Sequence, residues 1–73
     1  MENIIAEQRG ERSWSQAHLA KLLGVSRQTV ISIERGRFDP SLPLAFRIAE
    51  VFACRIEDLF TPQVAPVTEP EKS

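Results

Sequence analysis

The chain has 73 residues, the length of one small domain that must pack tightly to fold. Hydrophobic residues make up 42% and charged residues 26%, a composition that excludes wholesale disorder and a fibrous repeat. The single cysteine, Cys54, excludes an intramolecular disulfide and a cysteine metal cluster, and no membrane span or signal peptide is recognisable, so we expect a cytoplasmic protein with no membrane partner.

The charges are unevenly distributed along the chain. A net charge of −1 does not by itself indicate a nucleic-acid partner, because such binding domains commonly carry an excess of Lys and Arg. Residues 21–37, however, contain four basic side chains and one acidic side chain, a local net charge of +3. Residues 1–20 contain two basic and three acidic side chains, a net charge of −1. Residues 38–73 contain three basic and six acidic side chains, a net charge of −3. A basic middle segment therefore remains despite the overall balance.

Helix-favouring residues begin near the N-terminus. We expect a first helix from Asn3 to about Arg12, with the Asn3 side chain as its N-cap. Gly10 weakens the second half of this helix, because an interior glycine costs up to about 1 kcal/mol relative to alanine. The helix should therefore be short or fray before Ser13.

Two further helices follow across a very tight turn. Ser15 can cap a helix over Gln16–Leu23, which Gly24 ends by adopting the left-handed conformation. After only one more residue, Ser26 can cap the next helix over Arg27–Arg35. Apolar residues repeat on one face of each helix, so both are expected to pack against a common core.

The second half of the chain predicts two more helices. Gly36 stops the preceding helix, and a short loop leads to Ser41, which can cap a helix over Leu42–Phe52. Pro43 is tolerated there because the N–H groups of a first helical turn have no intrahelical partner. A last short helical turn is expected over Ile56–Phe60.

These five segments predict an all-α domain over residues 1–60. No segment alternates between apolar and polar residues over the length of a strand, so no strand is expected. Residues 61–73 are polar and interrupted by prolines, and we interpret them as a flexible C-terminal tail.

A set of capping, small and apolar residues recurs at fixed spacing along the predicted helices: Ser15-Gln16, Leu19-Ala20, Leu23 to Val30, Ile33 to Gly36, Pro40-Ser41, Leu44-Ala45 and Ile48-Ala49. This set resembles the helix-turn-helix of the Cro and phage-repressor type, also called the xenobiotic-response-element family. The resemblance covers about Asn3 to Phe60 and implies a compact five-helix bundle of the lambda-repressor-like type. It also implies that Arg27–Arg35 is the recognition helix, which enters the major groove of DNA.

The resemblance assigns DNA contacts residue by residue. The positions that would read bases are Arg27, Gln28, Ser32 and Thr29. The positions that would contact phosphates are Gln16, Ser26, Arg35 and Arg37. Arginine can pair bidentately with guanine and glutamine with adenine, which suits these residue types to base reading. The alternative is a solvated helix face, and Thr29 could simply cover the turn.

The resemblance also concerns structural positions. Arg9 and Glu34 match positions that form a partly buried ion pair between the first and third helices, the alternative being two independent surface charges. Ala53 stands where the family usually has a helix-stopping glycine, and Arg55 where it has a Ser or Thr cap. These departures concern stability more than function.

The leading hypothesis is a transcriptional regulator, expected to be a repressor, that binds double-stranded palindromic DNA as a homodimer. The alternative is a protein-interaction module, such as an antitoxin-like partner of a toxin, that uses Ile31, the region of Phe46 and the tail. An enzyme is disfavoured, since the chain has one histidine, no catalytic triad spacing, no phosphate loop and no metal-ligand cluster. We expect no cofactor and no small-molecule ligand, because no second domain is available to build a pocket.

Overall fold

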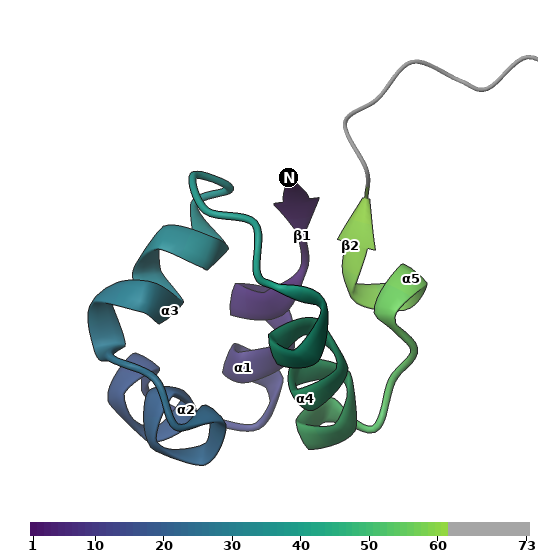
Figure 1. Cartoon of the computed structure of the whole chain (residues 1–73). Helices are drawn as coiled ribbons and strands as arrows, with labels where there is room; N and C mark the ends of the chain where they lie inside the picture. Colours follow the sequence, from purple (N-terminus) through teal and green to yellow (C-terminus); the bar gives the residue numbers. More distant parts are fainter. Residues whose placement is uncertain (62–73) are drawn as a thin grey trace, which may run out of the picture.

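The structure is a computed structural model that describes residues 1–61. These residues form five helices and a short antiparallel pair of strands (Figure 1), in the order β1 (Glu2–Asn3), α1 (Ile5–Glu11), α2 (Gln16–Leu23), α3 (Arg27–Glu34), α4 (Leu42–Phe52), α5 (Ile56–Leu59) and β2 (Phe60–Thr61). The prediction of a compact, mainly helical bundle is confirmed. The predicted flexible tail falls, except for its first residue, outside the described residues.

Three of the helices begin at the serines that the sequence indicates. The hydroxyl groups of Ser15, Ser26 and Ser41 each accept a hydrogen bond from the backbone N–H three residues later, at 2.9, 3.1 and 3.3 Å. Gly24 ends α2 with a φ of 73°, as predicted for a left-handed C-cap. The short connection between α2 and α3 therefore follows from local signals alone.

The prediction for the first helix is wrong at its start. The helix α1 spans Ile5–Glu11, while Asn3 belongs to β1 and pairs with Phe60, which was expected in the last helix. Asn3 does not act as the N-cap residue, but its Oδ1 accepts the Ile5 N–H at 3.1 Å and its Nδ2 donates to the Ile33 carbonyl at 2.8 Å. The strands were not expected because two residues are too few to show an alternating pattern.

The core lies between the α2–α3 pair and α4, with α1 in the middle of the view in Figure 1. It is built from residues of all five helices and of β2, namely Ile5, Leu19, Ala20, Leu23, Val30, Ile33, Ala45, Ile48, Ala49, Phe52, Leu59 and Phe60. Within residues 1–61, no helix has the length and apolar character needed to cross a bilayer.

Two arginines bind the carboxyl ends of neighbouring helices. Arg12 donates from Nη2 to the Phe52 carbonyl at 3.0 Å, and its guanidinium lies 5.0 Å from the centre of the Phe52 ring. Arg47 donates from Nη1 to the Leu23 carbonyl at 2.9 Å. Because the last carbonyls of a helix have no intrahelical partner and carry partial negative charge, these contacts hold the ends of α4 and α2 in place.

Candidate nucleic-acid interface

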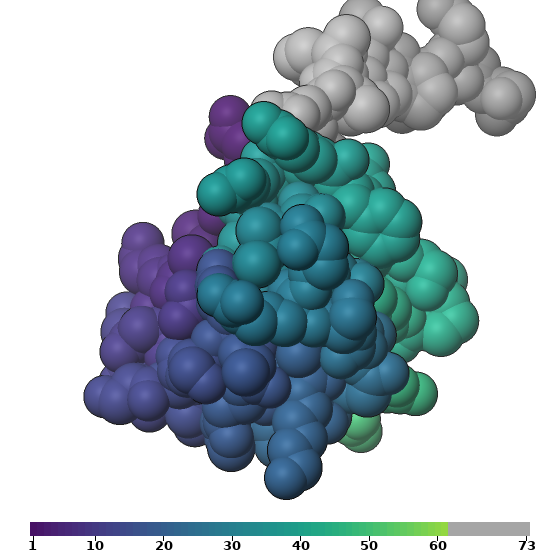
Figure 2. All heavy atoms as spheres, turned by 90° about the vertical axis from the view of Figure 1, so that its left-hand side faces the viewer, coloured from purple at the N-terminus to yellow at the C-terminus, as the bar shows by residue number. Residues whose placement is uncertain are grey.

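The α2–turn–α3 unit forms one outer face of the molecule. In Figure 1, α3 lies at the edge of the bundle, and Figure 2 shows this side with α3 across its middle. Val30 and Ile33 are 1% and 2% exposed and fix the inner side of α3 against the core, whereas Arg27 and Gln28 are exposed. The amphipathic spacing of α3 therefore turns its polar side outward.

The four residues expected to read bases lie in two settings. Arg27 and Gln28 are exposed in the first turn of α3, while Thr29 and Ser32 are partly buried. The Thr29 hydroxyl lies 2.9 Å from the Ser26 hydroxyl, so it is already engaged beside the cap. Thr29 is thus positioned by the turn as well as by the helix.

Ser26, Gln28, Thr29 and Ser32 line one hollow of about 220 Å³ together with Phe38. Phe38 belongs to the loop after α3 and is 46% exposed. Sequence reasoning missed it, because no local periodicity places a loop residue beside α3.

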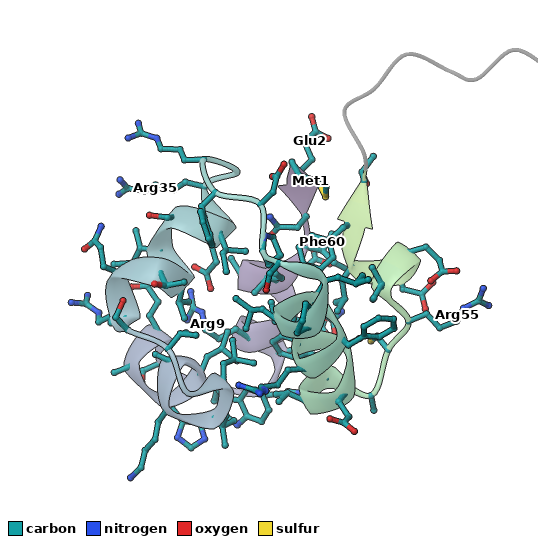
Figure 3. All side chains as sticks on the ribbon, viewed as in Figure 1. Met1, Glu2, Arg9, Arg35, Arg55 and Phe60 are labelled. Atoms are coloured by element: carbon teal, nitrogen blue, oxygen red, sulfur yellow. The ribbon has the colours of Figure 1, made fainter. Side chains whose placement is uncertain are left out.

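The residues expected to contact phosphates surround this face. Ser26 caps α3, and Arg35 and Arg37 are exposed just beyond its last residue. The Arg35 side chain extends away from the bundle in Figure 3. Within residues 1–61, no hydrogen bond or ion pair occupies the side chains of Arg27, Arg35 or Arg37. These three cations are consequently available to a negatively charged partner.

A polar network joins α1, α2 and α3 below this face. Arg9 donates to Glu34 from Nε at 2.7 Å and from Nη2 at 3.3 Å, and donates from Nη1 to the Trp14 carbonyl at 2.9 Å. Gln16 also donates to Glu34, from Nε2 to Oε1 at 3.1 Å. The structure thus brings Arg9 and Glu34 together, and it holds the amide of Gln16 at the start of α2.

The network also affects the electrostatics of the face. The Arg9 and Glu34 side chains are only 20% and 7% exposed. The hydrogen bond to Glu34 raises the pKa of Arg9, although burial acts in the opposite direction, so the guanidinium stays charged. Because Glu34 is the one carboxylate of residues 21–37 and is paired with Arg9, it does not neutralise the exposed arginines.

Metal-ligating side chains are not clustered in the part of the chain that the structure describes. No group of three or more His, Cys, Asp and Glu side chains in residues 1–61 is arranged to hold an ion. The one histidine, His18, is exposed on α2, and its ring centre lies 5.5 Å from that of Trp14.

Comparisons with known proteins agree with this geometry. A family model described as helix-turn-helix matches residues 5–59. An uncharacterized HTH-type transcriptional regulator of Methanocaldococcus jannaschii is 53% identical over 60 residues, which cover 82% of this chain and 91% of the relative. The uncharacterized HTH-type transcriptional regulator YgzD of Bacillus subtilis is 43% identical over 60 residues, with the same two coverages of 82% and 91%.

Solved structures share the fold. The hypothetical transcription factor NHTF from Neisseria has a TM-score of 0.68 and 26% identity over 74% of this chain, which spans 61% of that protein's length. The SOS-response transcriptional repressor LexA from Eubacterium rectale has a TM-score of 0.72 and 23% identity, over 94% of this chain and 74% of that one, a likeness that shows the fold alone. With the arrangement of α2 and α3 described above, the chain belongs to the helix-turn-helix family of the Cro and phage-repressor type.

Proposed function

We propose that this protein is a sequence-specific transcriptional repressor that inserts α3 into the major groove of its operator DNA. The observation that carries the proposal is the outer face of α3. It presents two exposed polar side chains, Arg27 and Gln28, with the unoccupied cations Arg35 and Arg37 beyond its end. The proposal places the protein in the cytoplasm, which holds the genomic DNA of archaea and bacteria such as those that encode its relatives.

Base reading is assigned to the first turns of α3. The guanidinium of Arg27 can donate two hydrogen bonds to guanine, and the amide of Gln28 can pair bidentately with adenine, each contact contributing about 1–3 kcal/mol of discrimination. Ser32 lies one turn beyond Gln28, and Thr29 lies beside Ser26. Gln28, Thr29 and Ser32 line one hollow, and Arg27 is exposed beside Gln28 at the start of the helix.

Phosphate contacts are assigned to the rim of this face. The N-terminus of α3 carries unpaired N–H groups and the positive end of the helix dipole, both of which favour a phosphate near Ser26. The Gln16 amide donates one N–H to Glu34 and keeps a second N–H for a phosphate oxygen. Arg35 and Arg37 supply the charge.

The protein acts as a homodimer in this proposal, because a palindromic site presents two equal half-sites. The surface that we assign to the second copy is on α4, where Leu42 and Phe46 lie one turn apart and are 64% and 59% exposed. Exposure of this apolar pair to water is unfavourable, and a second copy that covers the pair removes that surface from water. The protein-interaction alternative invokes Ile31, which is only partly exposed, and the region of Phe46, which we assign instead to the second copy.

Selection of bound sequences from a random DNA library tests the proposal. The wild type should enrich one palindromic sequence, and Gln28→Ala should lose the preference at one base position per half-site while keeping the others. Uniform weakening would instead assign Gln28 to a phosphate. No enriched sequence, together with binding that does not depend on salt, would contradict the proposed function.

Salt dependence tests the phosphate contacts separately. Each phosphate neutralised by an arginine contributes about 0.9 to the slope of log affinity against log salt, so Arg35→Gln should reduce the slope of a dimer by about 1.8. Arg55→Gln is a matched control, because Arg55 lies at the opposite end of the molecule from Arg35 (Figure 3). Equal slopes for wild type and Arg35→Gln would show that Arg35 does not contact a phosphate.

Sedimentation equilibrium tests the dimer surface. Leu42→Glu should give a monomer, and an acidic residue in the first turn of α4 is compatible with the helix dipole. Leu22→Glu makes the same change at a leucine of α2 that is 43% exposed, and it should remain dimeric. A dimer with Leu42→Glu would show that the copies meet elsewhere.

A further inference from the structure

Phe38 stands beside the residues assigned to base reading although it is not part of α3. It shares the hollow described above with the cap residue Ser26 and with three residues of α3, Gln28, Thr29 and Ser32. The wall formed by these four residues carries hydroxyl and amide groups, while Phe38 supplies the apolar wall. An aromatic ring that is 46% exposed is thus part of the proposed DNA-facing surface rather than of the core.

The backbone around Phe38 is held in place. The N–H of Arg37 donates to the Ser32 carbonyl at 3.0 Å, and Gly36 turns the chain with a φ of 74° directly after α3. On the other side, the ring of Pro40 restricts its own φ and the conformation of the preceding residue. The backbone is therefore restrained on both sides of Phe38, whose side chain lines the hollow together with Ser32.

The chemistry of this hollow matches one base edge better than the others. Thymine presents a hydrogen-bond acceptor, O4, next to a methyl group, which is the one apolar group in the major groove. The hydroxyl of Ser32 can donate to O4, while the ring of Phe38 can cover the methyl group. Cytosine lacks the methyl group and presents a donor in place of the acceptor.

We propose that Phe38 is a specificity-determining residue that contacts the methyl group of a thymine next to the bases read by α3. This inference rests on the proposed function and extends it to a residue outside the recognition helix. Phe38 adds contact with the methyl group, the part of thymine that hydrogen bonding by α3 does not read.

Removal of single methyl groups from the DNA tests this inference. Each thymine of the selected operator is replaced in turn by deoxyuracil, which differs only by the methyl group, and affinities are measured for wild type, Phe38→Ala and Phe38→Leu. For the wild type, one replacement per half-site should weaken binding about fourfold, the value expected for burying one methyl group. With Phe38→Ala the same replacement should have no effect, and with Phe38→Leu its effect should be smaller than in the wild type.

Leu22→Ala is the matched control, because Leu22 is 43% exposed on α2 and does not line the hollow. It should keep the deoxyuracil profile of the wild type. Thermal unfolding of each variant accompanies the binding data, so that a loss of fold is recognised, and Phe38→Leu retains bulk if Phe38→Ala proves unstable.

Several results would overturn the inference. The wild type could be insensitive to every deoxyuracil replacement, or Phe38→Ala could keep the sensitivity of the wild type. Phe38→Ala could also weaken binding to all sequences by the same factor. The last result would assign the ring to the sugar-phosphate backbone. These outcomes leave the proposed function intact, whereas failure to select any operator would overturn both.

Discussion

Replacing Arg9 with methionine should strongly destabilise the fold, because it leaves the nearly buried carboxylate of Glu34 without its ion-pair partner. Methionine keeps an apolar stem but removes three hydrogen bonds, two to Glu34 and one to the Trp14 carbonyl. The Glu34 side chain is 7% exposed and would retain the single hydrogen bond from Gln16.

The magnitude follows from the burial of the two partners. Breaking a fully buried ion pair costs about 3–5 kcal/mol. The Arg9 side chain is 20% exposed, so water already contacts part of this pair. We therefore expect a smaller cost than for a fully buried pair, about 2–3 kcal/mol for Arg9→Met. Residues 1–61 should have a total unfolding free energy of about 3–9 kcal/mol, so the variant would lose a large share of it.

Urea unfolding of a double-mutant cycle measures the effect. Glu34→Gln should cost less, about 1–2 kcal/mol, because the remaining Arg9 charge keeps some contact with water. The Arg9→Met, Glu34→Gln double variant should be more stable than the sum of the single changes predicts, by about 1–2 kcal/mol. A loss below about 0.5 kcal/mol for Arg9→Met, with additive single changes, would refute the reasoning.

Changes at three other positions test the local structure. Ala53→Gly should raise the unfolding free energy by about 0.5–1 kcal/mol, because Ala53 ends α4 with a φ of 55°, which glycine adopts without strain; an unchanged or lower melting temperature would contradict this. Asn3→Ala should cost about 2–3 kcal/mol in urea unfolding, because its side chain makes three hydrogen bonds, one to α3, one to α1 and one to the Met1 carbonyl; a loss well under 1 kcal/mol would show that these bonds contribute little. Ser26→Ala should lose about 1 kcal/mol with the cap, whereas Ser26→Asp should keep the cap and the stability but weaken DNA binding, since its carboxylate repels a phosphate. Full DNA affinity for Ser26→Asp would place the phosphate elsewhere.

The sequence by itself determined the helices on which the candidate site stands. Ser15, Ser26 and Ser41 begin α2, α3 and α4 as predicted, and Gly24 ends α2. Each of these signals is local, because a cap joins a side chain to a backbone group only three residues away. For the same reason the amphipathic spacing of α3 sufficed to place Val30 and Ile33 on its buried side.

The tertiary structure decided what joins distant parts of the chain. Asn3 pairs with Phe60 in the small sheet, Arg12 and Arg47 bind the ends of α4 and α2, and Phe38 reaches the side of α3. None of these contacts has a periodic signal, because each depends on how helices that are far apart in sequence pack around the common core.

The same distinction holds within the candidate site. The candidate DNA-contacting residues could be named from the sequence, but their hydrogen-bond partners could not. The Thr29 hydroxyl lies beside that of Ser26, and the Gln16 amide donates to Glu34. A side chain selects its partner from whatever packing brings within about 3 Å of it, and that distance is set by the whole fold.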